Sequence, residues 1–142
     1  MLIKQVSVFI ENKEGRLEKV TETIQNNNIN IISASLADSS EYGMFRMIVS
    51  EPERAKNVLK EAGFSAKLTE VIAVKLVKKV GMLHELFKVL VVADISVEYM
   101  YVLSTGDFGA MILKVSNSDK AIKALISNNF ELLNETETYI IN

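Results

Sequence analysis

The feature that most limits how this 142-residue chain can fold is an internal repeat with a constant spacing. Moving the sequence by the 66 positions that separate Gly15 from Gly81 brings many further residues into register without a gap between Gly15 and Phe64. Matched glycines and a constant offset predict two copies of one structural unit. The identical pairs include Leu17 with Leu83, Ile29 with Ile95, Gly43 with Gly109, Ala55 with Ala121, Leu59 with Leu125, and Phe64 with Phe130.

Hydrophobic spacing within the first copy predicts alternating strands and helices. Residues 3–10 alternate between apolar and polar, which is typical of a strand. Leu17, Val20 and Ile24 follow helical spacing in the next segment. The predicted order is a strand at 3–10, a helix at 16–27, strands at 30–37 and 42–50, a helix at 52–62, and a strand after Gly63.

The second copy repeats this plan, so the predicted fold class is α+β. We expect two ferredoxin-like βαββαβ repeats, each an antiparallel sheet with both helices on one face. The expected domains are 1–69 and 70–142, joined by a tight junction. Residues 65–78 must supply the last strand of one copy and the first strand of the next, either as one long shared strand or as a short strand that bends into another.

Composition excludes several classes of function. The chain is 49% hydrophobic and 24% charged, which is typical of a packed globular protein. A net charge of −2 gives no basic footprint for nucleic acid, and no apolar run reaches the roughly 20 residues of a membrane span. The absence of cysteine and a first segment that reads as a strand, not a signal peptide, favour a cytoplasmic location.

Two polar loops, residues 12–17 and 78–83, stand in equivalent places of the two copies. Each leads from a strand into a helix at a glycine, Gly15 or Gly81. Glycine permits the turn, and the amides at the start of the helix can then bind an anionic group. The alternative is that each glycine only forms the turn.

No catalytic or metal-binding constellation is recognisable. His84, near the start of a predicted helix, has no cysteine, second histidine or clear carboxylate cluster with which to bind a metal. No nucleophile–base pair or glycine-rich phosphate loop occurs either. We therefore predict a protein that is not an enzyme and that uses neither a metal nor a cofactor.

The surface of each sheet on the side opposite the helices is also expected to be apolar, which predicts a homodimer. A sheet that is apolar on both faces needs a cover beyond its own helices, from the other repeat or from a second chain. The residues expected on this face are Phe9, Ile32, Ala34, Leu36, Met44 and Ile48, with Met100, Val102 and Ile112 in the second copy.

The doubled β-α-β-β-α order, the two Gly-x-Leu loops and the segments Ile29-Asn30-Ile31 and Ile95-Ser96-Val97 resemble ACT domains over nearly the whole chain. The proline that usually precedes the loop glycine is replaced by Glu14 in one copy and by Val80 in the other. The resemblance implies a regulatory module that binds a free amino acid at a domain interface, through the glycine loop and the start of the second strand.

The resulting hypothesis is an amino-acid-binding regulatory protein. The alternatives are a non-catalytic interaction module or accessory subunit of an amino-acid biosynthetic enzyme and, with less support, a small enzyme. A metabolic enzyme is a possible partner. Since Met82 and Ser96 replace Arg16 and Asn30 in the second copy, the first loop is the stronger candidate if only one copy binds. The expected ligand-binding residues are Asn12, Glu14, Gly15, Arg16, Leu17, Asn30, Ile31, Val80, Gly81, Met82, Leu83, Ser96 and Val97.

Overall fold

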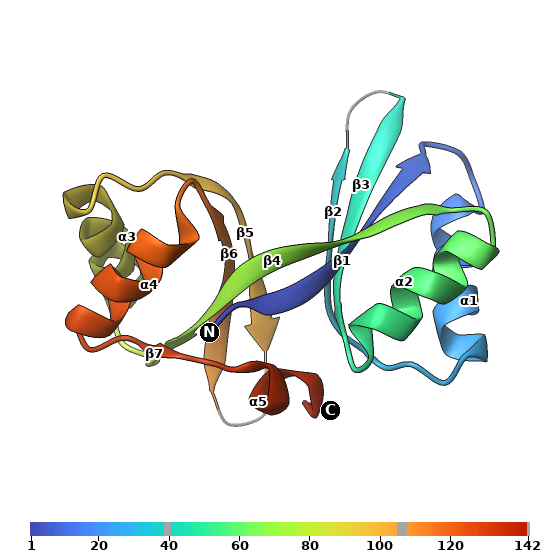
Figure 1. Ribbon diagram of the computed structural model, residues 1–142. Coiled ribbons are helices and arrows are strands. Elements are labelled where there is room, and N and C mark those ends of the chain that lie inside the picture. The colour runs from blue at the N-terminus through green and yellow to red at the C-terminus, as the bar shows by residue number, and fades with distance from the viewer. Residues whose placement is uncertain (39–40, 105–107, 142) are drawn as a thin grey trace. The chain divides into compact units, whose positions relative to one another are not determined.

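The computed structural model describes residues 1–38, 41–104 and 108–141, which form two compact units (Figure 1). The first-repeat unit contains Lys4–Thr69 and the C-terminal residues from Tyr139 onward. The second-repeat unit contains Met1–Ile3 and Glu70–Thr138. The short segments at the two chain ends are therefore exchanged between the repeats.

The first-repeat unit has the predicted ferredoxin-like arrangement. Its strands are hydrogen-bonded in the order β2-β3-β1-β4, and the β1·β3 and β2·β3 pairs are antiparallel. A crossover helix follows β1, and a second helix follows β3, as predicted. The elements are β1 (Ile3–Glu11), α1 (Arg16–Asn26), β2 (Ile31–Asp38), β3 (Tyr42–Val49), α2 (Pro52–Glu61) and the first part of β4 (Ser65–Leu76).

The second-repeat unit has the same arrangement, so the predicted fold class is confirmed. Its central order is β4-β6-β5, and β7 pairs with the other side of β4. Residues 65–76 form one strand, which crosses from one unit to the other between Thr69 and Glu70. The further elements are α3 (Met82–Val92), β5 (Val97–Ser104), β6 (Gly109–Val115), α4 (Ser118–Ser127), β7 (Glu131–Leu132) and α5 (Glu135–Tyr139). The sequence did not predict α5.

Each unit has its own hydrophobic core between its sheet and its two helices. In the first-repeat unit Val20 and Ile24 of α1 are buried together with Ala55 and Leu59 of α2, as the helical spacing predicted. The corresponding residues of the second-repeat unit are Leu86, Leu90, Ala121 and Leu125. The two repeats therefore bury equivalent helix residues in their cores.

A β-bulge in β2 reverses the expected faces of that strand. Ile31 pairs with Val49, but Ser33 pairs with Ile48, so one extra residue lies between them. Leu36 then lies opposite Phe45, and directly opposed residues share a face of the sheet. Phe45 belongs to the core under the helices. The prediction that Ala34 and Leu36 face away from the helices was therefore wrong, because the bulge moves them to the helix side.

The equivalent bulge occurs in β5, between Val97 and Tyr99. It places Met100 opposite Leu113 and Val102 opposite Met111, which are core residues of the second-repeat unit. Met100 and Val102 therefore also lie on the helix side of their sheet, contrary to the expectation. After the bulge, successive side chains of β2 and β5 alternate between the two faces of the sheet. The one-residue shift therefore reverses the predicted face of every later residue in each strand.

The face of the first-repeat sheet away from the helices carries an aromatic pair. Phe9 and Tyr42 stack with ring centroids 4.8 Å apart, and their exposed fractions are 46% and 43%. Met44 lies opposite Phe9, while Arg46 lies opposite both Ser7 and Ser35. This face is therefore apolar near the β3 start and more polar toward the middle of the strands.

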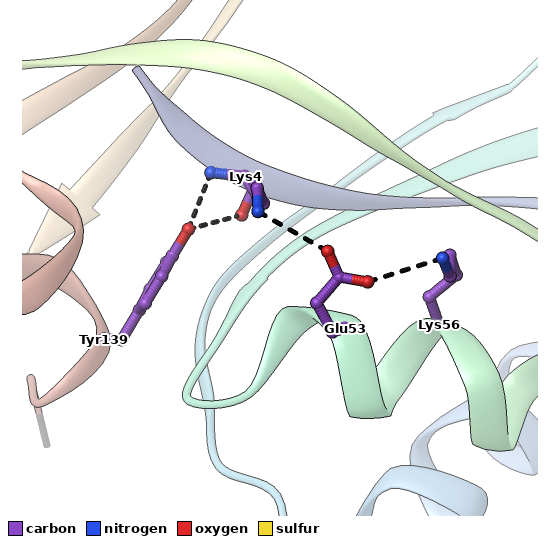
Figure 2. A network of polar contacts seen from close by, with 4 residues as sticks. All are labelled: Lys4, Glu53, Lys56 and Tyr139. Atoms are coloured by element: carbon purple, nitrogen blue, oxygen red, sulfur yellow. Dashed lines mark hydrogen bonds and ion pairs between the residues drawn. The ribbon is translucent and has the colours of Figure 1, made fainter. Parts of the chain in front are cut away.

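The C-terminal residues are fixed to the first strand by Tyr139 (Figure 2). The Lys4 backbone amide donates a hydrogen bond of 2.7 Å to the Tyr139 hydroxyl. The Lys4 side chain contacts Glu53 at 3.4 Å, and Glu53 contacts Lys56 at 3.5 Å. Desolvation raises the pKa of Glu53, but the hydrogen bonds and charges of Lys4 and Lys56 outweigh it and lower the pKa below its ordinary value.

Replacing Tyr139 with phenylalanine should destabilise the protein, because the Lys4 amide loses its partner. We expect the free energy of unfolding to fall by about 1 kcal/mol, the usual net contribution of one hydrogen bond. Urea denaturation followed by circular dichroism measures this change. Ile140→Ala is the matched control, since Ile140 is 72% exposed and should tolerate truncation. Equal stability of Tyr139→Phe and the wild type would contradict the anchoring role.

Candidate functional site

Both glycine loops adopt the same left-handed turn before a helix. Gly15 precedes α1 with φ +84°, and Gly81 precedes α3 with φ +89°. The turns are closed by equivalent hydrogen bonds, from the Arg16 amide to the Lys13 carbonyl at 3.3 Å and from the Met82 amide to the Lys79 carbonyl at 3.2 Å. The repeated sequence thus gives a repeated backbone geometry, which only glycine adopts without strain.

The first turns of α1 and α3 keep backbone donors available. No side chain caps either helix, whereas Asn117 caps α4 by accepting a hydrogen bond from the Lys120 amide. The Lys19 amide donates to the Gly15 carbonyl, but among the described residues no partner is found for the amides of Leu17 and Glu18. Such amides at a helix start attract anions, because their N–H groups point outward and the positive end of the helix dipole lies there.

The loop of the first repeat borders a hollow of about 410 Å³. We call it the first-repeat hollow. It opens between the end of β1, the start of α1 and the adjoining ends of β2 and β3. Its volume lies within the roughly 300–1,000 Å³ range of ligand pockets. The lining residues are Ile10, Glu11, Asn12, Lys13, Glu14, Gly15, Leu17, Leu36 and Gly43.

The rim of this hollow carries both signs of charge. Lys13 Nζ lies 3.0 Å from Glu11 Oε2, and the Lys13 hydrogen bond holds the pKa of Glu11 below its ordinary value. Glu11 is therefore ionised at neutral pH. Glu14 on the loop and Glu18 in the first turn of α1 are also exposed. Among the described residues, the lining of the hollow thus includes Lys13 and the carboxylates of Glu11 and Glu14, and Glu18 follows in the first turn of α1.

Arg16, expected among the ligand-binding residues, lies outside the lining of the hollow. Its guanidinium carbon lies 4.5 Å from the centre of the Phe64 ring, in the geometry of a cation–π contact. The Arg16 Nε atom is buried without a hydrogen-bond partner among the described residues. The side chain therefore packs on the apolar surface of its own unit, and its counterpart Met82 is suited to a similar packing role.

Asn30 and Ile31 lie at the opposite end of α1 from Gly15. The 11 residues of α1 span about 16 Å, and both residues follow the helix. The Asn30 amide donates to Ser50 Oγ at 3.0 Å, and its side chain donates to the Ile141 carbonyl at 3.2 Å. A separate hollow of about 480 Å³ lies here, lined by Thr21, Ile24, Gln25, Asn28, Ile29, Asn30 and Ile31. The first-repeat unit therefore does not bring the loop and Asn30 together.

The loop of the second repeat has the same backbone but a different surface. Val80 is 99% exposed, Leu83 is 40% exposed, and Met82 is half-buried. A hollow of about 340 Å³ beside this loop is lined by Lys75, Leu76, Val77, Lys78 and Phe108. Ser96 and Val97 again lie beyond the far end of the helix, where the Ser96 amide donates to Ser116 Oγ at 3.0 Å.

Five residues that line the first-repeat hollow were not among those predicted from the sequence, namely Ile10, Glu11, Lys13, Leu36 and Gly43. Glu11 and Lys13 adjoin the predicted loop and could have been included by proximity. The match of Gly43 with Gly109 was visible in the repeat but carried no assigned role. Leu36 could not have been found, because the β2 bulge decides which way it points.

The described residues contain no group of three or more histidine, aspartate or glutamate residues placed to hold a metal ion. In the same part of the chain, no helix is long and apolar enough to cross a membrane.

Comparison with known protein families identifies the class. The family model described as "ACT domain pair" matches residues 1–141, so the chain belongs to this family. This match confirms the resemblance to ACT domains that the sequence showed. ACT domains are regulatory, ligand-binding domains of amino-acid metabolism. The family is a regulatory module and not a catalytic one. No curated protein matches the sequence.

Solved structures agree with this assignment. The crystal structure of protein BT0572 from Bacteroides thetaiotaomicron is similar over 99% of this chain and 98% of that one, with 33% identity and a TM-score of 0.94. The ligand-free regulatory subunit of aspartate kinase from Thermus thermophilus has the same fold, with 13% identity and a TM-score of 0.61. That similarity covers 87% of this chain and 90% of the regulatory subunit.

Substituting Gly15 should destabilise the protein through its backbone alone. A Cβ atom at Gly15 would meet nothing within 4 Å, so the cost comes from the positive φ. We expect Gly15→Ala to lower the free energy of unfolding by about 1 kcal/mol in urea denaturation. Gly15→Asn should cost less, because asparagine tolerates this conformation, as Asn28 and Asn129 do here.

Gly109→Ala is the control for this pair, since a Cβ there also meets nothing within 4 Å and its φ is not positive. Its stability should stay near that of the wild type. If Gly15→Ala and Gly109→Ala were equally stable, the left-handed turn would not be the reason for glycine at position 15.

Proposed function

We propose that the protein is a cytoplasmic regulatory protein that binds a free α-amino acid in the first-repeat hollow. The observation that carries this proposal is the combination of unpartnered helix-start amides with a Lys13–Glu11 ion pair at one hollow. An α-amino acid has a carboxylate and an ammonium group on adjacent atoms, so it needs donors and acceptors close together. Membership of the ACT domain pair family supports the same class of ligand.

Each charged group of the ligand has a suitable counterpart at the rim. The carboxylate would accept hydrogen bonds from the Leu17 and Glu18 amides and attract Lys13. The ammonium group would donate to the carboxylate of Glu11 or Glu14, since carboxylate oxygens accept hydrogen bonds and do not donate them. Because the ligand supplies both charges, it could replace the contact between Lys13 and Glu11 without leaving either side chain unpaired.

At three positions beside its glycine loop, the second repeat has no carboxylate where the first has one. Val77, Val80 and His84 occupy the positions that correspond to Glu11, Glu14 and Glu18 in the first repeat. Lys78 and Lys79 replace Asn12 and Lys13, so the equivalent loop is basic. We therefore infer one amino-acid site per chain, at the first repeat. Gly81, Met82 and Leu83 stay a weaker candidate site, suited only to an anionic group, while Ser96 and Val97 lie beyond the far end of α3.

We also propose a homodimer, for two reasons. The first-repeat unit exposes apolar side chains, and its predicted ligand-binding residues lie in two separate places. Asn30 lies about 16 Å from the glycine loop along α1, so a ligand held by both would need them from different copies of the chain. The stacked and exposed Phe9–Tyr42 pair offers an apolar contact on the face away from the helices. Both features favour pairing of two chains.

Regulation would follow if the ligand favours one state of an interface over another. A ligand shifts an equilibrium only as far as its affinity differs between the two states. The loop and the ends of β2 and β3 both contact the hollow, so closing them around a ligand would change the surface that adjoins it. A metabolic enzyme that reads this surface is the partner class we propose.

A second candidate is a non-catalytic interaction module or accessory subunit of a biosynthetic enzyme, and one observation favours it. Val91, Val92 and Ile126 on α3 and α4 are 74%, 87% and 50% exposed. The corresponding residues of the first repeat are the polar Gln25, Asn26 and Lys60. An apolar surface that appears in only one of two matched helix layers is typical of a contact with another protein.

An amino acid that binds the folded protein should raise its melting temperature. We expect at least one of the twenty amino acids, at millimolar concentration, to do so in a thermal-shift screen. A ligand at one hundred times its Kd stabilises the folded state by about 2.7 kcal/mol. Gly15→Val should abolish this stabilisation, because the side chain strains the turn beside the hollow.

Gly81→Val is the matched control, since it introduces the same strain at the second loop and should keep the ligand-induced shift. A shift that survives Gly15→Val would exclude the proposed site. If no amino acid stabilises the wild type, the interaction-module reading replaces amino-acid binding.

The proposed homodimer predicts a molar mass of two chains by size-exclusion chromatography with light scattering. Phe9→Asp should shift the protein toward one chain, because it places a charge within the exposed aromatic pair. Val102→Asp is the control, since Val102 is also exposed, at 56%, but lies on the helix side of its sheet. Dissociation by Val102→Asp and not by Phe9→Asp would locate the interface elsewhere.

A further inference from the structure

The floor of the first-repeat hollow is apolar, although its rim is charged. Ile10, Leu17 and Leu36 line it from β1, α1 and β2. Ile10 is buried, but Leu17 and Leu36 remain 36% and 50% exposed. Leucine side chains left open to water beside a charged rim give the hollow two chemically different ends, one suited to a zwitterion and one to hydrocarbon.

Gly43 lets Leu36 and Ile10 approach the backbone of β3 closely at the apolar end. It lies opposite Ile10 on β3, and a Cβ atom there would approach Leu36 Cδ1 to 3.2 Å and Ile10 Cγ1 to 3.5 Å. Any side chain at this position would therefore crowd Leu36 and Ile10, which already occupy this space. No positive φ requires glycine at position 43, so the close approach of Leu36 to the backbone is the physical consequence of its missing side chain.

The second repeat provides an internal comparison. Gly109 corresponds to Gly43, but a Cβ there would meet nothing within 4 Å. The hollow of that repeat is bordered by Lys75, whose Nζ lies 4.6 Å from the centre of the Phe108 ring. A cation over an aromatic ring thus borders this hollow, together with Leu76 and Val77. The two hollows therefore differ in their apolar lining, which comes from three aliphatic residues of separate elements in the first repeat.

We propose that the ligand of the first-repeat hollow is an α-amino acid with an aliphatic side chain, of the size of valine, leucine or isoleucine. This inference rests on the proposed function and adds the class of side chain. The charged rim binds the ammonium and carboxylate groups, and the side chain enters the apolar end of the hollow, against Ile10, Leu17 and Leu36. A polar or charged side chain in this position would lose water without gaining a hydrogen-bond partner.

Isothermal titration calorimetry of the full chain with leucine, isoleucine, valine, alanine, serine, aspartate and lysine tests the proposal. Because each buried methylene strengthens binding several-fold, leucine, isoleucine or valine should bind at least about tenfold more tightly than alanine or serine. Aspartate and lysine should bind more weakly than alanine. 4-Methyl-2-oxopentanoate, which has the leucine side chain but no ammonium group, should also bind at least about tenfold more weakly than leucine.

Two variants test where the side chain binds. Gly43→Ala should weaken leucine binding about tenfold or more while affecting alanine less, because it narrows only the apolar end. Leu36→Asn should weaken binding of leucine and leave that of alanine within about twofold. The matched controls are Gly109→Ala and Val102→Asn, at the equivalent positions of the second repeat, and both should bind leucine as the wild type does. Circular dichroism melts of each variant establish that it is folded.

The possible failures are distinguishable. If no amino acid binds, the proposed function fails and this inference fails with it. If serine or aspartate binds best and Gly15→Val abolishes that binding, the proposed function stands and the aliphatic class is wrong. If leucine binds best but both Gly43→Ala and Leu36→Asn bind it unchanged, the side chain lies elsewhere and the assignment of the apolar end is overturned.

Discussion

The pairing register around the bulges of β2 and β5 is the constraint on which the rest of each unit depends. One extra residue after Ile31, and one after Val97, sets which side chains of these strands face the helices. The β2 bulge brings Leu36 to the same side of the sheet as Ile10 and Gly43. Without it, the strand would present a serine there, and the first-repeat hollow would lose part of its apolar floor.

Duplication has preserved the backbone and the cores while the surfaces of the two repeats have diverged. Both loops turn at a glycine of positive φ, and both helices start without a side-chain cap. In and beside the first loop are three glutamates, and the second repeat has two valines and a histidine at the corresponding positions. The exposed helix surface shows the opposite change, from polar residues in the first repeat to Val91 and Val92 in the second. One scaffold therefore presents two different surfaces, which suits a protein with separate sites for a ligand and a partner.

Membership of the ACT domain pair family and the geometry of the hollow support different parts of the proposal. The family assigns a regulatory, ligand-binding role in amino-acid metabolism. It does not identify the ligand, since similar folds bind different molecules when the residues around the site differ. The proposal takes that detail from the chain's own residues: the Glu11–Lys13 pair suits a zwitterion, and the lining by Ile10, Leu17 and Leu36 suits an aliphatic side chain.

The sequence by itself determined the duplication, the order of elements, the helix faces and the two glycine turns, because each depends on local spacing or on backbone freedom at one residue. Val20 and Ile24 are buried as their helical spacing predicted. The tertiary structure decided the strand faces after the bulges, the packing of Arg16 on Phe64, and the attachment of Tyr139 to Lys4. These features depend on residues distant in the chain, and hydrophobic periodicity contains no information about such contacts.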